Sequence, residues 1–241
     1  MSPDEFEHTK LYTAKSIVKI AYESKGNIGI AFTYNEPGTF YEYMLEVSGF
    51  AKEYGLKTVM VTNGYINRQP LEELLPSIDA FNVDLKAFSE GFYREITQSR
   101  LAPVKKSIKA IALSGKNLEI TNLVIPGLND NFEEFEEMVK WIASETGDRT
   151  VLHISRYFPS YHLKIDATPV NTLLDLYDIS KKHLKFVYLG NIIDKVRGTT
   201  YCDKCNEKLI VRDALKTLIV GLNKQGNCIH CGNHVINHMQ D

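Results

Sequence analysis

Short apolar runs alternate along the chain with segments whose apolar residues recur every three or four positions. The run Ile28–Tyr34 is rich in apolar and β-branched residues and predicts a buried strand, which Pro37 would end. The next segment, Thr39–Tyr54, has helical spacing and closes at Gly55. Because this succession of strand and helix repeats, the pattern predicts βα units around a parallel sheet.

Six strands are expected before residue 190, each bounded by turn signals or by a helical pattern. They are Ile28–Tyr34, Lys57–Thr62, Ala80–Leu85, Asn117–Ile125, Val151–Ser155 and Phe186–Leu189. Helices are expected at Lys10–Lys25, Thr39–Tyr54, Leu71–Leu75, Glu90–Thr97, Ala102–Leu113, from Asp130 to about Glu145, and at Pro169–His183. Since no Gly-x-Gly-x-x-Gly follows the first strand, a barrel or open half-barrel is expected rather than a dinucleotide-binding domain.

Composition and charge narrow the class of protein. The 241 residues are 44% hydrophobic, enough for a substantial core, and 28 basic residues balance 30 acidic ones. A net charge of −2 argues against a broad nucleic-acid surface. No apolar run approaches the ~20 residues of a membrane-spanning helix, and the polar N-terminus is not a signal peptide. A cytoplasmic protein with no membrane or nucleic-acid partner is expected.

Polar side chains stand where several of the expected strands stop. They are Glu36, Asn63, Asp84, Lys86, His153 and Arg156. In a parallel barrel the carboxyl ends of the strands form one face, so these side chains are expected to converge. Carboxylates suit an ammonium group, basic side chains suit a carboxylate, and an amide suits a hydroxyl. The set therefore predicts a site for a zwitterionic, polar ligand.

Each of these residues also has a purely structural interpretation. Glu36 could favour a helix N-terminus, and Asn63–Gly64 is a common turn dipeptide. The two charges of Asp84–Lys86 could pair in the barrel wall. A histidine in an apolar strand, such as His153, is more often a satisfied core residue, and Arg156 could cover the barrel edge with its stem. The repeated placement at strand ends, rather than any one residue, supports a site.

All four cysteines lie after residue 200, in two C-x-x-C pairs. They are Cys202, Cys205, Cys228 and Cys231. Two such pairs around one tetrahedral ion are the zinc-ribbon pattern, so a structural zinc site is expected, with rubredoxin-like iron as the alternative. Disulfides are disfavoured in a cytosolic protein. The composition changes near Arg197, which predicts a barrel domain over residues 1–197 and a paired-cysteine module over 198–241.

A series of motifs carries a family resemblance. In order they are FTYNEPGTFYEY, KTVMVTNGYI, NVDLKAF, TNLVIPGLND, HISRYFP, VYLGN and YCDKC. The series resembles the radical S-adenosylmethionine (SAM) enzymes of the AmmeMemoRadiSam group, relatives of the pyruvate formate-lyase activating enzymes. The resemblance implies a partial (β/α)₆ barrel and a [4Fe-4S] cluster that cleaves SAM to a 5′-deoxyadenosyl radical, which abstracts hydrogen from a substrate. The implied partners are an unknown substrate, proteins included, and Memo-type and Amme-type proteins.

The same resemblance implies a role for each strand-end residue. Glu36 stands where the family contacts the methionyl ammonium group of SAM, and Asn63 falls in a motif near the cofactor. The segment Asp84–Lys86 matches a motif that bounds the cofactor and the substrate. His153 matches a histidine near the ribose, and Arg156 is close by.

One departure from the family pattern is informative. The family holds its cluster with a C-x-x-x-C-x-x-C loop after the first barrel strand, whereas no cysteine precedes Cys202 here. Iron–sulfur clusters depend on cysteine ligation, so the chain is expected to be inactive alone. The expected fold is a partial (β/α)₆ barrel missing its first strand, plus a small zinc-ribbon-like module. Alternatives are a non-catalytic SAM- or partner-binding module with a zinc ribbon, and a metal-dependent hydrolase or aldolase.

Overall fold

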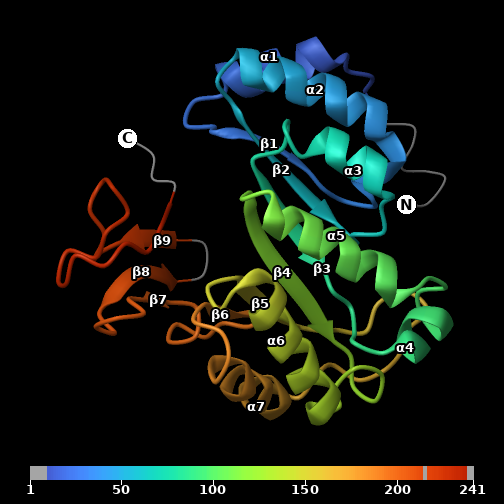
Figure 1. Ribbon diagram of the computed structural model, residues 1–241, viewed down its shortest axis with the longest axis vertical. Helices are drawn as coiled ribbons and strands as arrows, with labels where there is room; N and C mark the ends of the chain where they lie inside the picture. The colour runs from blue at the N-terminus through green and yellow to red at the C-terminus, as the bar shows by residue number, and fades with distance from the viewer. Residues whose placement is uncertain (1–9, 214–215, 238–241) are drawn as a thin grey trace. The chain divides into compact units, whose positions relative to one another are not determined.

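The computed structural model describes residues 10–213 and 216–237 (Figure 1). The chain divides into two compact units, Met1–Val83 with Pro103–Leu118 and Asp84–Ala102 with Glu119–Asp241. Six strands form one sheet in sequence order, β1-β2-β3-β4-β5-β6. The pairs β1–β2, β2–β3, β4–β5 and β5–β6 are parallel. The predicted α/β fold is therefore confirmed, including the number of strands.

The first unit holds three parallel strands and the helices beside them. Their bounds are α1 (Ala14–Glu23), β1 (Gly29–Phe32), the 3₁₀ helix η2 (Pro37–Phe40), α2 (Tyr41–Glu53), β2 (Lys57–Thr62), α3 (Arg68–Leu74), β3 (Ala80–Asp84) and α5 (Leu101–Leu113). Helices α1 and α2 contact each other and both contact β1, as Figure 1 shows. Ile30 lies opposite Thr58 in the parallel register of β1 and β2.

The second unit holds three parallel strands, their helices and a small antiparallel sheet. The bounds are α4 (Glu90–Glu95), β4 (Asn117–Val124), α6 (Phe132–Thr146), β5 (Val151–Arg156), α7 (Val170–Lys181), β6 (Val187–Gly190), β7 (Thr200–Tyr201), β8 (Lys208–Asp213) and β9 (Lys216–Ile219). Helix α7 packs on β5 and β6 and also contacts α6. The order β7-β8-β9 forms the separate three-stranded sheet.

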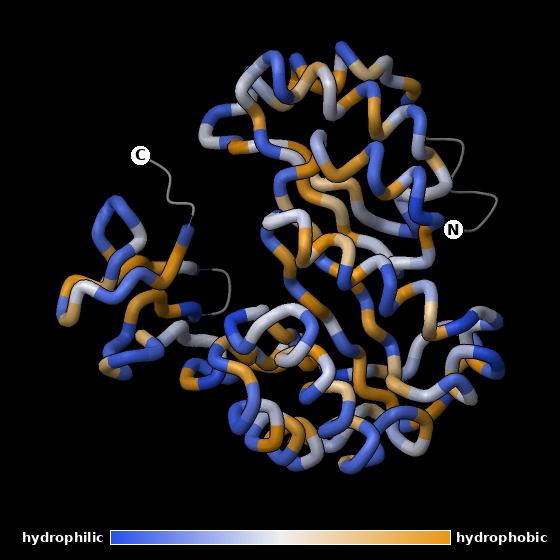
Figure 2. Tube along the Cα trace, in the orientation of Figure 1, coloured by the Kyte–Doolittle hydropathy of each residue, from blue (hydrophilic) through white to orange (hydrophobic). Residues whose placement is uncertain are grey.

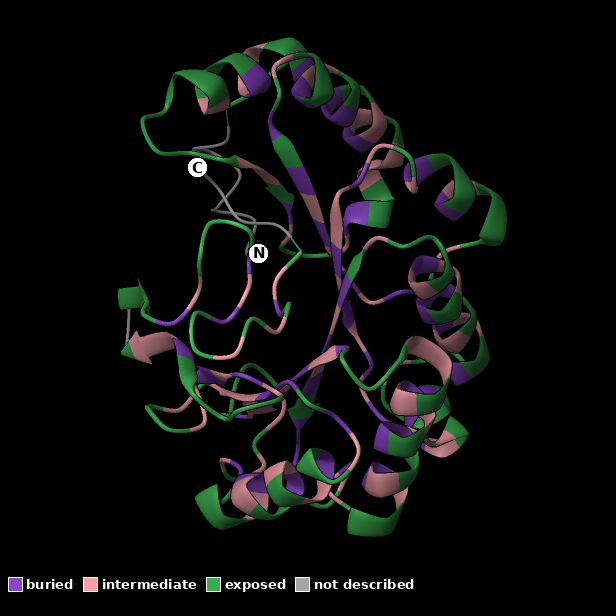
Figure 3. Ribbon diagram, turned by 60° about the vertical axis from the view of Figure 1, so that its left-hand side comes forward, coloured by how far each residue is buried: buried purple, intermediate pink, exposed green. Residues whose placement is uncertain are grey.

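The strands bury alternate residues, which decides where polar side chains can stand. In β5, Leu152 and Ile154 are fully buried, whereas His153 between them is only partly buried. Successive side chains of a strand point to opposite faces, so one face carries the apolar core and the other carries the polar residues. Figure 2 shows apolar residues gathered along the strands, and Figure 3 shows exposed residues along one side of the helices.

Three predicted helix starts are corrected by the capping groups. Helix α1 begins at Ala14 rather than near Lys10, because the Thr13 hydroxyl accepts a hydrogen bond from the Ser16 N–H at 3.3 Å. Asn131, not Asp130, caps α6 and accepts from the Glu134 N–H at 2.8 Å. The predicted start at Asp130 is therefore wrong. Pro169 is the residue before α7 rather than in its first turn.

The C-terminal module contains the expected hairpin, since β8 and β9 pair antiparallel. Its buried cluster combines Phe186 at the start of β6 with Cys202, Leu209, Cys228 and Val235. One continuous core therefore joins the module to the strands of the second unit. The domain division near residue 197 stays a prediction. No helix within the described residues is long and apolar enough to cross a membrane.

Candidate functional site

Glu36 is held firmly at the carboxyl end of β1. Its Oε1 accepts from the Thr62 hydroxyl at 2.6 Å and from the Gly38 N–H at 3.2 Å. Its Oε2 accepts from the Asn63 N–H at 2.8 Å. Because these donors come from η2 and from the end of β2, the carboxylate is fixed against two neighbouring strands. The structure thus brings Glu36 and Asn63 together, and it also adds Thr62, which the sequence analysis missed.

The backbone just before Glu36 adopts an uncommon conformation. Tyr34 and Asn35 have φ angles of 60° and 50°, in the left-handed region. This region is costly for a bulky residue such as tyrosine and persists only where surrounding structure demands it. The turn lets Glu36 follow β1 directly and hydrogen-bond to the end of β2. Strained backbone of this kind is concentrated at functional sites.

The structural interpretation of Asn63 also holds. Its Oδ1 accepts from the Tyr65 N–H at 2.7 Å, which is the side-chain turn expected of an Asn-Gly pair. Gly64 has a φ of 69°, and a Cβ placed there would lie 2.8 Å from Val83 Cγ1. Only glycine fits this close approach. Asn63 therefore shapes the end of β2, and its backbone N–H orients Glu36.

The second unit contains the other four predicted residues. Asp84 Oδ2 and Lys86 Nζ form an ion pair at 3.0 Å, with side chains 37% and 39% exposed. This is the wall pair that the sequence analysis offered as the structural alternative. Partly exposed ion pairs of this kind contribute little to stability. Because more than a third of each side chain is exposed, both charges remain accessible to a ligand.

His153 lies on the polar face of β5, opposite Tyr188 of β6 in the parallel register. Its Nε2 lies 2.7 Å from Glu119 Oε2, and its ring centroid lies 5.7 Å from that of Tyr188. The pattern of strand-end residues did not point to the carboxylate partner, Glu119. A signal was available, because Glu119 stands at an unburied position in the alternating pattern of β4. His153 is thus hydrogen-bonded to a carboxylate on the neighbouring strand β4.

Arg156 is bound locally. Its Nε donates to the Thr168 carbonyl at 2.8 Å, and its guanidinium lies 4.8 Å from the centroid of the Phe158 ring. Side chains three residues apart on a strand point to opposite faces, so Arg156 and His153 do not share a face of β5. These contacts fit a residue that holds the segment between β5 and α7.

The four cysteines form one cluster. The Sγ atoms of Cys202 and Cys231 lie 3.6 Å apart, as do those of Cys205 and Cys228, and all four lie within 4.8 Å of one another. Disulfide sulfurs would be about 2.05 Å apart, so these cysteines are free. Four sulfurs at ~2.3 Å from one ion would lie about 3.8 Å apart in a tetrahedron. The cluster therefore fits a single metal ion.

Cys202 is the thiol of the first C-x-x-C pair that is prepared for a metal. A backbone hydrogen bond from Glu207 lowers the pKa of its partner Cys205, but burial and hydrogen bonds with the other three thiols outweigh it and raise that pKa to about 12. Burial alone would raise the pKa of Cys202, but hydrogen bonds from the backbone N–H groups of Cys205 and Lys204 outweigh it and lower the pKa to about 6. A thiolate is the metal-binding form of cysteine. The Asn233 amide also approaches Cys202 Sγ at 3.8 Å.

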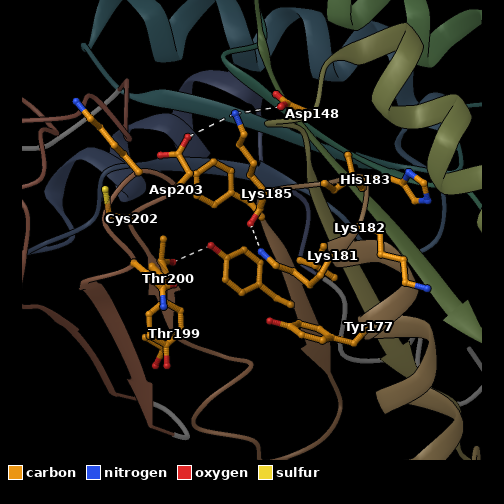
Figure 4. Close-up of a pocket in the computed structure, with 17 residues that line it drawn as sticks. Asp148, Tyr177, Lys181, Lys182, His183, Lys185, Thr199, Thr200, Cys202 and Asp203 are labelled. Atoms are coloured by element: carbon orange, nitrogen blue, oxygen red, sulfur yellow. Dashed lines mark hydrogen bonds and ion pairs between the residues drawn. The ribbon is translucent and has the colours of Figure 1, made fainter.

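The C-terminal module contacts the residues just before β6 through charged side chains. Figure 4 shows Lys185 between Asp148 and Asp203, with Nζ–Oδ2 distances of 3.0 Å and 3.9 Å. These residues border a cavity of about 390 Å³. Burial lowers the pKa of Lys181, whose Nζ donates to the Lys185 carbonyl. Four lysines and two aspartates line this cavity, and the contact between Lys185 and Asp203 ties the C-terminal module to the residues just before β6.

The barrel strands contain no cysteine that could hold a [4Fe-4S] cluster. The sequence has four cysteines, and all four belong to the C-terminal module, where their sulfurs surround space for one ion. Iron–sulfur clusters are held by cysteine thiolates. The residues of this chain therefore do not fit the three-cysteine cluster site of the family.

Comparison with known proteins shows which family the chain resembles. The family model described as the Radical SAM superfamily matches residues 3–142. Uncharacterized protein MJ0808 of Methanocaldococcus jannaschii is 35% identical over 236 residues, which cover 97% of this chain and 69% of that protein. Pyruvate formate-lyase-activating enzyme of Clostridium pasteurianum is 25% identical over 121 residues, half of each chain. The chain spans 40–58% of the length of three activating enzymes that it matches.

Solved structures share the fold. A domain of pyruvate-formate lyase-activating enzyme from Bacteroides vulgatus has a TM-score of 0.59 and 16% identity, covering 68% of this chain and 99% of that one. Streptococcus suis SuiB bound to S-adenosylmethionine has a TM-score of 0.62 and 18% identity, covering 76% of this chain and 44% of that one. The chain belongs to the radical SAM superfamily, whose cofactors are SAM and an iron–sulfur cluster, and it is similar to the activating enzymes within it.

Proposed function

We propose that this chain binds SAM at the carboxyl ends of its strands and serves a radical SAM reaction of the activating-enzyme type. The observation that carries the proposal is the carboxylate of Glu36, fixed at the end of β1 by three hydrogen bonds. Oε2 accepts a single protein hydrogen bond within the described residues and so has room for one more donor. The methionyl ammonium group of SAM is such a donor, and the pairing would be charge-assisted.

The remaining strand-end residues take the roles that the family resemblance implies. We assign Asn63 to the cofactor edge and Asp84 with Lys86 to the border between cofactor and substrate. His153 is proposed near the ribose, and Arg156 supports the segment after β5. Membership of the AmmeMemoRadiSam group, contact with Memo-type and Amme-type proteins, and a cytoplasmic location remain predictions of the resemblance and the composition.

A specific observation favours a second candidate, a non-catalytic SAM-binding module. Every cysteine of the sequence belongs to the C-terminal cluster, so the chain's own residues supply binding and orientation of SAM without a barrel cluster. Metal analysis after anaerobic reconstitution separates the two candidates. About one zinc and no iron per chain, with SAM bound intact, favours the binding module. Production of 5′-deoxyadenosine by this chain favours the enzyme.

The SAM site is tested by isothermal titration of the Glu36→Gln variant. A hydrogen bond to a charged group contributes about 1.5–3 kcal/mol, so the variant should bind SAM ~10–150-fold more weakly. Glu72→Gln is the matched control, because Glu72 pairs with Arg68 on the exposed surface of α3. Equal SAM affinity of Glu36→Gln and wild type, with both proteins folded by circular dichroism, would refute the assignment.

A further inference from the structure

A second cavity lies within the second unit, beside the polar face of β4, β5 and β6. Its volume is about 500 Å³, within the range of small-molecule sites. Strand residues form one side, and the segment after β6 together with the C-terminal module forms the other. Apolar side chains cover much of the wall: Val151, Leu189, Ile192, Ile193 and Ile236. The cavity therefore suits a ligand with an apolar body.

Most ionisable side chains around this cavity already have a partner. The two carboxylates and the lysine of the lining each contact a basic or acidic side chain. The pairs are Glu119 with His153 at 2.7 Å, Asp194 with Arg197 at 2.9 Å, and Lys195 with Asp213 at 2.8 Å. Asp194 is further stabilised by the backbone N–H groups of Val196 and Arg197, at 3.0 Å and 2.9 Å. The two ion pairs cancel in charge, and the Glu119 carboxylate is hydrogen-bonded to the His153 ring.

Arg212 is the exception. It reaches the cavity from β8, and its Nη1 donates to the Gly198 carbonyl at 3.1 Å and to the Thr200 hydroxyl at 2.9 Å. Its guanidinium lies 5.1 Å from the centroid of the Tyr188 ring. Across residues 10–213 and 216–237, Arg212 forms no ion pair with a carboxylate. A part-buried guanidinium that meets only neutral groups leaves an uncompensated positive charge beside the cavity.

Tyr188 reinforces this polarity. Burial raises the pKa of Tyr188, so the phenol stays protonated and neutral near pH 7. Its hydroxyl lies 2.7 Å from the Thr200 hydroxyl. The neutral phenol adds a hydrogen-bonding group next to Arg212 without cancelling its charge.

We infer that this cavity binds a small organic monoanion, a carboxylate with an apolar body, whose carboxylate pairs with Arg212. Guanidinium groups bind carboxylates through two parallel hydrogen bonds, and a single uncompensated charge suits a monoanion. The apolar wall would take the body of the ligand. The site needs the C-terminal module, because both Arg212 and Thr200 belong to it. His153, proposed near the ribose of SAM, also lines this cavity, but the carboxylate contact inferred here is made by Arg212 and not by Glu36.

The test uses the full chain loaded with zinc and ligand-observed saturation-transfer NMR with hexanoate as the probe. Hexanol and hexylamine have the same number of carbon atoms and no negative charge. Hexanoate should bind, and both controls should bind at least tenfold more weakly. Arg212→Gln should weaken hexanoate binding by ~10–150-fold, from the loss of a charged hydrogen bond. Arg94→Gln, at an exposed arginine that pairs with Glu95, should leave binding unchanged.

A second pair of variants keeps the test valid if Arg212→Gln disturbs the module. Ile193 lines the cavity and is 79% exposed, so charged residues fit there without unfolding. Ile193→Glu should weaken hexanoate binding and Ile193→Lys should strengthen it, each about threefold. Equal affinity of both variants, preference for hexylamine, or no hexanoate binding by wild type would overturn the inference. Glu36→Gln should keep hexanoate binding, so a failure of the Glu36 assignment can be told apart from a failure of this inference.

Discussion

Arg149, just before β5, contacts the C-terminal module through several hydrogen bonds. Its guanidinium donates to the carboxylate of Asp203, inside the first C-x-x-C pair, and to the carbonyls of His234 and Val235, both at 3.2 Å. It also lies 5.1 Å from the centroid of the Phe186 ring. The Arg149→Ala variant removes all of these contacts at once, so it should weaken the attachment of the module.

The magnitude follows from burial. The Asp203 side chain is 9% exposed and that of Arg149 is 40% exposed, so the pair is intermediate between a buried and a surface ion pair. Removing one partner of a buried pair costs about 3–5 kcal/mol, whereas surface pairs contribute about 0.2–1 kcal/mol. Lys185 lies 3.9 Å from Asp203 and still compensates part of its charge. We expect Arg149→Ala to lower the free energy of unfolding of the C-terminal module by about 2–3 kcal/mol, which is ~30–150-fold in the unfolding equilibrium constant.

The assay is a urea titration of the chain loaded with Co²⁺, followed through the cobalt–thiolate absorption of the module. Arg94→Ala is the control, since its partner Glu95 is exposed and the expected change is below ~0.5 kcal/mol. Asp203→Asn removes the buried charge, so the double variant should lose less stability than the sum of the two single variants. A midpoint for Arg149→Ala equal to that of Arg94→Ala would refute the reasoning.

Three further predictions concern the first unit. Gly29→Ala would place a Cβ 2.1 Å from the Lys57 carbonyl oxygen and should destabilise by more than ~2 kcal/mol in thermal unfolding. Gly49→Ala, inside α2 with open space around it, should instead stabilise by about 0.5–1 kcal/mol, and the opposite result would contradict this reading. Partial burial raises the pKa of Asp79, but hydrogen bonds from the Thr58 N–H and from Lys57 outweigh it and hold the pKa below its ordinary value. The contribution of the ionised Asp79 is present above about pH 4 and is lost as the pH falls through the lower, folded-state pKa. Asp79→Asn should therefore destabilise at pH 7 and become neutral in strong acid, as urea titrations at several pH values would show.

The sequence pattern predicts most of the elements because their signals are local. The strand Lys57–Thr62 is found with the predicted bounds, since its buried alternation and its Asn-Gly stop both lie within the segment. The start of α6 was placed one residue early, because Asp130 and Asn131 are equally good caps by residue type. Asn131 accepts from the Glu134 N–H, whereas Asp130 accepts from the Gly127 N–H at 2.8 Å. Only the path of the backbone decides between them.

The cysteine cluster was also predictable from local spacing. Two C-x-x-C pairs determine the ligand set before any fold is known, because each pair forms one turn around a metal. The placement of the module on the second unit was not predictable. It depends on Phe186 and Arg149, which precede the cysteines by tens of residues and carry no motif of their own.

The sequence by itself determined the order of strands and helices, the four-cysteine cluster, and Glu36 as the carboxylate at the end of β1. These features depend on residue type and spacing along the chain. Only the tertiary structure decided that Thr62 and Asn63 orient Glu36, that Glu119 pairs with His153, and that Arg212 faces a cavity without a carboxylate partner among the residues described. Which side chains of different strands contact each other depends on the register of the strands and on side-chain direction, and the local sequence pattern does not determine the register.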